Sequence, residues 1–517
     1  MRLRATQLTD ARDRTFEVVV LGGGPAGCAA ASLLARRSHR VALVTPAAPP
    51  AGSLAESIPP SAHRILEEVG FLDAVRQAGL HPNRGNTVWW AGEEARVESF
   101  TDDRIGVHTD RASLERTLTT ATEAAGVRVF PDTTARAAHE SESGWTVQCT
   151  SEDGEELTLA AEWIVDATGR HGLLARHEGR VPDRSTTTLA LIQRWRSPSG
   201  WPSEVLGHTL VESYPDGWAW SVPLSDDVRC FTAMVDQRDA DLAGLDVADM
   251  LARELDRTEH IGGLLTDAGP EGDAWACPAS LYTAERFARP GLILAGDAGS
   301  FIDPLSSFGV KKALSSGWLA GIAVHTALSD PTMTAPAVDF YDAREREVYR
   351  SFRAASAEFF ESAAAAHQTS YWTERATAAR AAAAPSASRL TDFGDPLEPA
   401  LPEAEIRAAF DAIRDRDPLV ALPGASLRAI ERPGVEGHRL VMRPHLASDR
   451  LPGGMRYVRD VDLSALVEVA PQHGQVPDGW AAYNGMAPPV TLPDYLTALA
   501  TAFAAGFLEH GAPGTTV

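Results

Sequence analysis

The sequence predicts an α/β protein with three parts: a domain built on a strand–helix–strand unit, an antiparallel sheet inserted in it, and a small C-terminal α+β domain. The first observation is a short apolar run at residues 18–21 that ends in a glycine-rich turn, as a strand buried on both faces does. The second is the alternating pattern between about 190 and 235, which favours antiparallel strands. The third is a stretch rich in Ala, Ser, Pro and Asp at 381–402, which indicates a linker.

A chain of 517 residues is too long for one small module. We expect a first domain at 15–385, in which the antiparallel sheet occupies about 185–275. A linker at 386–402 then leads to a C-terminal domain at 403–517.

The elements follow from propensity and periodicity. An alanine-rich helix at 28–37 and a strand at 41–44 complete the strand–helix–strand unit. Further elements expected in the first domain are a helix at 112–125, strands at 163–165 and 291–295, a helix at 246–266, and a long helical region from 310 to about 382, interrupted near 330. The C-terminal domain is expected to contain a helix at 403–414, short strands between 426 and 460, and helices at 461–470 and 493–509.

Composition and charge exclude several classes of protein. A net charge of -23 argues against nucleic-acid partners and anionic membrane surfaces. Long apolar runs and a signal-peptide core are not seen, so we expect no membrane association and a cytoplasmic location. The four cysteines lie far apart, so neither a disulfide framework nor a metal site is expected.

Arginine replaces lysine almost throughout the chain. Of the 47 basic residues, only Lys311 and Lys312 are lysines. Heavy use of Ala and Arg indicates a GC-rich genome and needs no functional reason. The place of the two lysines is a separate question, because both lie on the first turn of a predicted helix after Gly309.

The glycine-rich turn has the pattern Gly22-x-Gly24-x-x-Gly27, with Pro25 and Ala26 inside it. Gly22 permits a tight turn, Gly24 lets the backbone approach a pyrophosphate, and Gly27 lets helix and strand pack closely. The helix N-terminus then directs unpaired N–H groups at the phosphate. Because the turn lies between a strand and a helix, we interpret it as a Rossmann-like dinucleotide site.

One position departs from this pattern. The second strand of such a unit ends in an acidic residue that binds the ribose hydroxyls, but here it ends in Thr45. A hydroxyl is a weaker partner than a carboxylate. Either the ribose is bound less tightly or another residue takes this role.

Three further motifs follow in order. Asp110-Arg111 precedes a helix, where an arginine could reach phosphate or flavin oxygens; Asp166-Ala-Thr-Gly169 follows a strand; and Gly296-Asp297 ends another strand. Together with the glycine turn they resemble the FAD-dependent monooxygenases of the p-hydroxybenzoate hydroxylase type, over roughly residues 15–330. The resemblance implies an FAD cofactor whose ribityl chain is bound by Asp297.

Two motifs are similar to those of the flavin-dependent halogenase branch. Trp218-Ala-Trp220-Ser-Val-Pro223 resembles WxWxIP, and residues 301–309, with Pro304 and Gly309, match FxxPxxSxG. In relatives the helix that starts here, at Gly309 and Val310, faces the flavin and helps to form a halide site. The two tryptophans either pack the core or keep substrate away from the flavin, and both readings can hold.

Halogenases of this group deliver hypohalous acid through a lysine ahead of an aromatic strand. The matching position here is Asn83, whose amide is not a nucleophile, and arginine is a poor substitute. Lys311 and Lys312 stand where a cation opposes the helix dipole. They are therefore candidates for contact with the flavin or the substrate, with solvated lysines as the alternative.

The resemblance implies an FAD-dependent monooxygenase that hydroxylates an electron-rich aromatic substrate through a flavin C4a-hydroperoxide. The substrate is either a small molecule or a tryptophan side chain in a partner polypeptide, which the C-terminal domain would recognise. A second dinucleotide motif is not seen, so reductant visits transiently or a separate flavin reductase supplies reduced flavin. The alternatives are a halogenase with an unusual halogen carrier and an FAD-binding maturation or chaperone protein.

Overall fold

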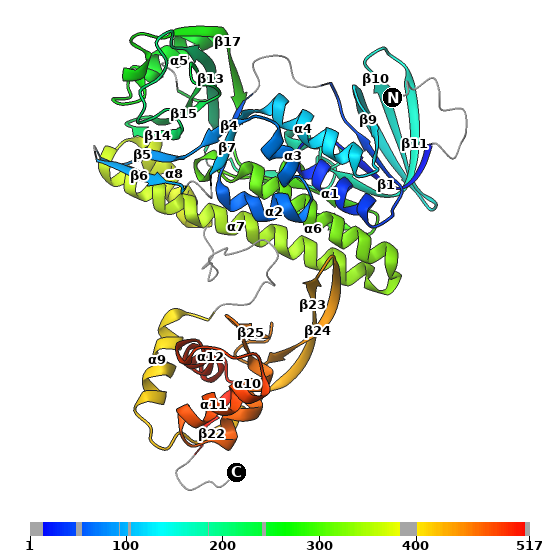
Figure 1. Cartoon of the computed structure of the whole chain (residues 1–517), viewed down its shortest axis with the longest axis vertical. Coiled ribbons are helices and arrows are strands. Elements are labelled where there is room, and N and C mark those ends of the chain that lie inside the picture. The colour runs from blue at the N-terminus through cyan, green and yellow to red at the C-terminus, as the bar shows by residue number, and fades with distance from the viewer. Residues whose placement is uncertain are drawn as a thin grey trace. The chain divides into compact units, whose positions relative to one another are not determined.

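The computed structural model describes residues 14–47, 54–92, 94–101, 105–184, 186–239, 244–382 and 401–511. The chain forms two compact units, Met1–Ala384 and Pro385–Val517 (Figure 1). The predicted linker at 386–402 lies almost entirely outside the described residues. The recognition role of the C-terminal domain stays a prediction.

A mainly parallel sheet forms the centre of the first unit. Its strand order is β19 (Ala288–Arg289), β20 (Leu292–Leu294), β11 (Glu156–Asp166), β1 (Thr15–Leu21), β2 (Val41–Val44) and β8 (Arg128–Phe130), and the hairpin strands β10 (Gly144–Ser151) and β9 (Thr133–Ser141) extend from β11. Val18, Val19 and Val20 are fully buried, as expected for the centre of a parallel sheet covered on both faces. The Rossmann-like α/β prediction is confirmed.

The described residues of the first unit include eight α-helices. The helices of the first unit are α1 (Pro25–Arg36), α2 (His63–Glu68), α3 (Leu72–Gln77), α4 (Arg111–Ala124), α5 (Val247–Leu255), α6 (Gly309–Ser329), α7 (Thr334–His367) and α8 (Ser370–Ala382). The predicted helical region after 310 therefore breaks twice, near 330 and again at Gln368, which has a φ of 54°. A Cβ on Gly317 of α6 would overlap the carbonyl of Ala26, so this glycine permits α1 and α6 to approach closely.

The second sheet of this unit has seven strands. Their order is β17 (Gly269–Pro278), β13 (Thr188–Arg196), β16 (Val228–Asp236), β15 (Gly217–Pro223), β14 (His208–Tyr214), β5 (Gly85–Trp89) and β6 (Ala95–Ser99). The strands pair antiparallel except β14 and β5, which are parallel. The sequence range of about 185–275 misses β5 and β6, which join this sheet from far earlier in the chain (Figure 1).

The helix predicted at 246–266 is shorter in the structure. It ends at Leu255, and a 3-10 turn follows at Gly262–Leu265. Two small sheets complete the unit: β3 (Ala55–Ile58), β7 (Gly106–Asp110) and β4 (His81–Asn83), and β12 (Arg180–Pro182), β18 (Tyr282–Ala284) and β21 (Ser300–Phe301).

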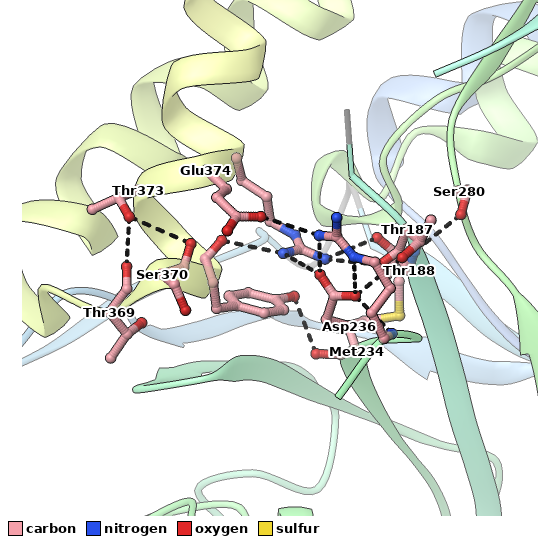
Figure 2. Close-up of polar contacts among 12 residues, drawn as sticks. Thr187, Thr188, Met234, Asp236, Ser280, Thr369, Ser370, Thr373 and Glu374 are labelled. Atoms are coloured by element: carbon pink, nitrogen blue, oxygen red, sulfur yellow. Dashed lines mark hydrogen bonds and ion pairs between the residues drawn. The ribbon is translucent and has the colours of Figure 1, made fainter. Parts of the chain in front are cut away.

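Helix α8 is held against the seven-stranded sheet by a polar cluster (Figure 2). Arg375 of α8 donates to the Thr187 carbonyl at 3.1 Å and lies 3.5 Å from the Asp236 carboxylate. Arg238 joins Asp236 to Glu374 of α8, at 2.8 and 3.1 Å. Burial acts to raise the pKa of Asp236, but these partners outweigh it and lower that pKa to about 2. The ionised carboxylate therefore fastens the helix to the sheet.

The second unit is α+β. Its elements are α9 (Glu403–Arg414), β22 (Ala421–Pro423), β23 (Arg428–Glu436), β24 (Arg439–Ala447), β25 (Tyr457–Val458), β26 (Val461–Asp462), α10 (Leu463–Val469), α11 (Val476–Met486), α12 (Leu492–Ala504) and β27 (Leu508–His510). The prediction of a helix at 403–414 is confirmed, whereas α11 was not predicted. Tyr483 of α11 and Tyr495 of α12 are buried in a common apolar core.

Candidate functional site

The glycine turn after β1 has the geometry that a pyrophosphate site requires. Gly22 has a φ of 104°, and a Cβ there would overlap the Ala167 carbonyl. A Cβ on Gly27 would overlap the carbonyl of Gly22, so this glycine permits strand and helix to pack. On Gly24 a Cβ would approach only the ends of two side chains, Arg111 at 3.3 Å and Glu115 at 3.7 Å. Gly24 is thus open to the cavity, beside the N-terminus of α1.

Arg111 lies opposite this turn, at the start of α4. Its guanidinium donates to Glu56 at 2.8 Å and to Glu115 at 2.7 Å. Burial opposes the charge on Arg111, but the two carboxylates outweigh it and raise the pKa of the guanidinium. Burial also raises the pKa of Glu56. Arg111 is therefore a fixed cation at the cavity wall, and Glu56 beside it was not singled out from the sequence.

Thr45 follows β2 directly behind the turn. Its hydroxyl donates to the Pro46 carbonyl at 3.3 Å, and a Cβ on Gly23 would strike the Thr45 side chain. The residue is packed against the loop and has a local partner, so the ribose role suggested for this position stays a prediction.

The Gly296-Asp297 turn is held from several sides. Gly296 has a φ of 63° and donates its N–H to Ser316 at 2.8 Å. The Asp297 carbonyl accepts from Tyr282 at 2.6 Å, which leaves the Asp297 carboxylate on the cavity wall. These hydrogen bonds therefore hold the turn that carries this carboxylate in place without a ligand.

Lys312 also holds the Gly296-Asp297 turn in place. Its side chain is buried, and Nζ donates to the carbonyls of Gly296 at 2.9 Å and Ser300 at 2.5 Å. Nζ also lies 3.8 Å from the Asp297 carboxylate. Lys311 places Nζ 5.4 Å from the Phe308 ring centre. Among the residues described, neither lysine lines the cavity, which gives no support to direct contact with flavin or substrate.

The Asp166 carboxylate forms hydrogen bonds within its own loop. The buried carboxylate accepts from the N–H and hydroxyl of Thr168, at 3.0 and 2.6 Å, and from the N–H of Leu174 at 2.7 Å. The next residues line the cavity, including Arg170, whose guanidinium lies 4.7 Å from the Phe301 ring centre. Arg170 was not proposed from the sequence, although it follows the motif directly.

One cavity of about 830 Å³ joins these parts. That volume lies within the range of about 300–1,000 Å³ usual for ligand sites. The cofactor side is lined by Gly24, Pro25, Ala26, Glu56, Arg111, Ala167, Arg170 and Asp297, and the sheet side by Ala190, Arg194, Trp220, Trp275, Cys277 and Ala279. Open backbone at Gly24, a helix N-terminus and a fixed arginine fit an FAD pyrophosphate, and Asp297 fits a polyol.

The two halogenase-like motifs meet at this cavity. Trp220, Pro304 and Gly309 line it. Trp218 is 2% exposed and lies in the core, and Val310 is also buried. One ring of the motif therefore packs in the core and the other faces the cavity, and a role in keeping substrate away from the flavin stays a prediction.

Asn83 is buried near a small side pocket. Its amide donates to Ser57 at 3.0 Å, and its carbonyl accepts from the N–H of Gly85 at 3.2 Å. Ser57 in turn lies 2.8 Å from the Thr209 hydroxyl. Ser57 and Thr209 line a pocket of about 60 Å³ together with both tryptophans of the motif, so Asn83 lies behind the wall of this pocket.

The family follows from comparison with known proteins. The model of the FAD binding domain family matches residues 15–321. The chain belongs to this family, binds FAD and is an FAD-dependent oxidoreductase of the flavin-dependent halogenase-like branch.

Individual relatives define its neighbourhood. A tryptophan 2-halogenase of Chondromyces crocatus is 29% identical over 375 residues, covering 69% of this chain and 70% of that protein. The solved structure of CmlS, a flavin-dependent halogenase, matches with a TM-score of 0.76 at 20% identity, covering 96% of each chain. That of QhpG, a peptidyl tryptophan dihydroxylase essential for tryptophylquinone cofactor biogenesis, matches with 0.65 at 22% identity, covering 95% and 99%.

Two kinds of feature are absent from the described residues. The helices there include none with the length and apolarity that a membrane span needs. Clusters of three or more His, Cys, Asp or Glu suited to a metal ion are likewise absent from this part of the chain.

Proposed function

We propose that this protein oxygenates an electron-rich aromatic substrate by hydroxylation rather than halogenation. The observation that carries the proposal is the lack of an amine to carry halogen. Lys311 and Lys312 are the only lysines in the chain. Both lie on α6, one of them bound to two backbone carbonyls, and neither lines the cavity.

The side chains around the cavity would divide the work. FAD supplies the oxygen-activating chemistry when bound. The N-terminus of α1, Arg111 and Asp297 would hold it, and Lys312 would keep the Asp297 turn in position. Trp220 and Phe301 would exclude water and present a flat apolar surface to an aromatic substrate.

The substrate and the reductant are further parts of this proposal. QhpG is a peptidyl tryptophan dihydroxylase, and its structure aligns along 95% of this chain. This favours a tryptophan side chain in a partner polypeptide, with the second unit as its recognition domain. One glycine-rich dinucleotide motif serves the FAD, so we expect a separate flavin reductase to supply electrons.

The test is turnover coupled to a flavin reductase, with indoles, phenols and tryptophan-containing peptides offered under ¹⁸O₂. Hydroxylation predicts one heavy oxygen per hydroxyl in the product and a rate that bromide does not change. Asp297→Ala, with weakened FAD binding, is the matched control for unspecific oxidation by free reduced flavin. A regioselective product that forms only with bromide would contradict the proposal.

A halogenase with a different carrier is the second candidate. It is favoured by the tryptophan motif and the 301–309 motif, whose Trp220, Pro304 and Gly309 line the cavity, and by the name of the Chondromyces relative. The same assay separates the two, because only halogenation requires halide.

A further inference from the structure

Three tryptophans form a continuous row of rings between the cofactor cavity and the surface of the first unit. Trp220 lines the cavity. The ring centres of Trp220 and Trp218 lie 5.0 Å apart, and those of Trp218 and Trp90 lie 6.3 Å apart. At these separations neighbouring rings are in contact. The row joins two residues of β15 to one that follows β5.

The far end of the row opens at the surface. Trp90 is half-buried and lines a separate cleft of about 320 Å³. Glu94, Glu358 and Arg96 share this cleft, so acidic groups outnumber basic ones there. The indole N–H of Trp90 donates to the Phe359 carbonyl at 2.9 Å. Both features stabilise a transient positive charge on this ring.

A second branch of rings is less suited to carry such a charge. Trp372 lies 5.3 Å from Trp90, and Tyr371 lies 4.9 Å from Trp372. That branch ends under the guanidinium of Arg375, 3.6 Å from the Tyr371 ring centre. Trp372 and Tyr371 are both buried, whereas Trp90 borders a cleft, so the row has its exit at Trp90.

We propose that Trp220, Trp218 and Trp90 carry oxidising equivalents out of the cavity. Indole loses one electron more readily than any purely apolar side chain. A reduced flavin that meets dioxygen without substrate would release hydrogen peroxide, and one-electron reduction of this peroxide by further reduced flavin would give hydroxide and a hydroxyl radical. The proposed function is not required, since any FAD enzyme that meets dioxygen has this hazard. The row then protects the protein when substrate is missing.

Each step of this transfer moves one electron. Trp220 gives one electron to a hydroxyl radical, which becomes hydroxide. The Trp220 radical cation takes one electron from Trp218, and Trp218 takes one from Trp90. A soluble reductant of the ascorbate class gives one electron to Trp90 at the cleft and releases one proton, which converts the hydroxide to water. The three indoles are restored, and one molecule of reductant is oxidised.

Light provides a direct test, because a photo-excited flavin accepts an electron from an adjacent indole. FAD-loaded protein is illuminated with blue light and ascorbate without oxygen, and bleaching of the flavin absorbance is followed. Trp218→Phe and Trp90→Phe should lose this bleaching while flavin fluorescence stays quenched by Trp220. Trp220→Phe should lose both the bleaching and the quenching.

Trp145→Phe is the matched control. Trp145 is buried, as Trp218 is, and it lies beside Gly291, at the end of β20 away from Asp297. It should bleach as the unaltered protein does. Wild-type bleaching in both Trp218→Phe and Trp90→Phe, at unchanged FAD content, would overturn the proposal.

A second measurement does not depend on light. Reduced enzyme is reoxidised repeatedly in air without substrate, and peptides are mapped by mass spectrometry. Oxidation should collect on Trp90 in the unaltered protein, and on Trp218 and Trp220 in Trp90→Phe. Equal oxidation of Trp218 and Trp220 in both proteins would refute the row. Neither experiment reports on hydroxylation, so failure here and failure of the proposed function are distinguishable.

Discussion

Replacing Lys312 with methionine tests whether the Lys312 ammonium holds the Asp297 turn in place. The change keeps most of the apolar stem and removes the ammonium that donates to the Gly296 and Ser300 carbonyls. Both carbonyls would then lack this donor in a buried place, and Asp297 would lose a cation 3.8 Å away. Breaking a buried charged arrangement of this kind costs about 3–5 kcal/mol. We expect the free energy of unfolding to fall by that amount.

The Lys312→Met substitution should also weaken FAD binding. A looser turn no longer holds the Asp297 carboxylate in place, so the Kd for FAD should rise about tenfold or more, which corresponds to about 1.4 kcal/mol. Unfolding of the apoprotein by urea and fluorescence titration with FAD measure the two effects separately.

Two variants make this result interpretable. Lys311→Met removes the neighbouring lysine, which lies beside the Phe308 ring, and should change stability by less than about 1 kcal/mol. Lys312→Arg keeps the charge but brings a larger planar group into a buried site, so it should not restore the unaltered protein. The reasoning fails if Lys312→Met unfolds and binds FAD as Lys311→Met does.

The remaining predictions concern the cofactor, the halogen carrier and pH. Gly24→Val should abolish FAD binding, because the side chain would enter the pyrophosphate site; a full complement of FAD after gel filtration would refute this. Asp297→Ala should weaken FAD by about 1–3 kcal/mol in a flavin titration, and an unchanged Kd would mean that the carboxylate does not bind the cofactor. Asn83→Lys should gain a bromide-dependent product that Asn83→Gln lacks, and no product in either would place the carrier position elsewhere. The pKa of Asp236 is lowered from 3.8 to about 2, so the stability that its carboxylate contributes is present above pH 3.8 and is lost as pH falls through about 2. Asp236→Asn should therefore lower the free energy of unfolding in urea by about 2 kcal/mol at neutral pH. A loss of the same size below pH 2 would contradict this.

The sequence predicts the features whose cause lies within a few residues. Gly22, Gly24 and Gly27 act through the turn they occupy, and Asp297 follows its strand directly. Their geometry therefore agrees with the expectation from the motifs alone.

Features that depend on distant partners were not predictable in this way. The participation of β5 in the seven-stranded sheet depends on pairing with β14, more than a hundred residues later. Lys312 is a candidate for contact with the flavin or the substrate because of its place after Gly309, but the motif alone does not show that its ammonium donates to the carbonyls of Gly296 and Ser300. The contact between Trp90 and Trp218 depends on the fold placing β15 in the same sheet as β5, although the two strands are far apart in the sequence.

The burial of Lys312 also has a practical consequence for chemical modification. With every other basic side chain an arginine, reagents that acylate amines have Lys311 and the terminal amine as their targets. A fluorophore or spin label on Lys311 would report from the first turn of α6, two residues from Gly309 of the cavity wall. The chain thus provides a built-in attachment point for following cofactor and substrate binding, without any engineered cysteine.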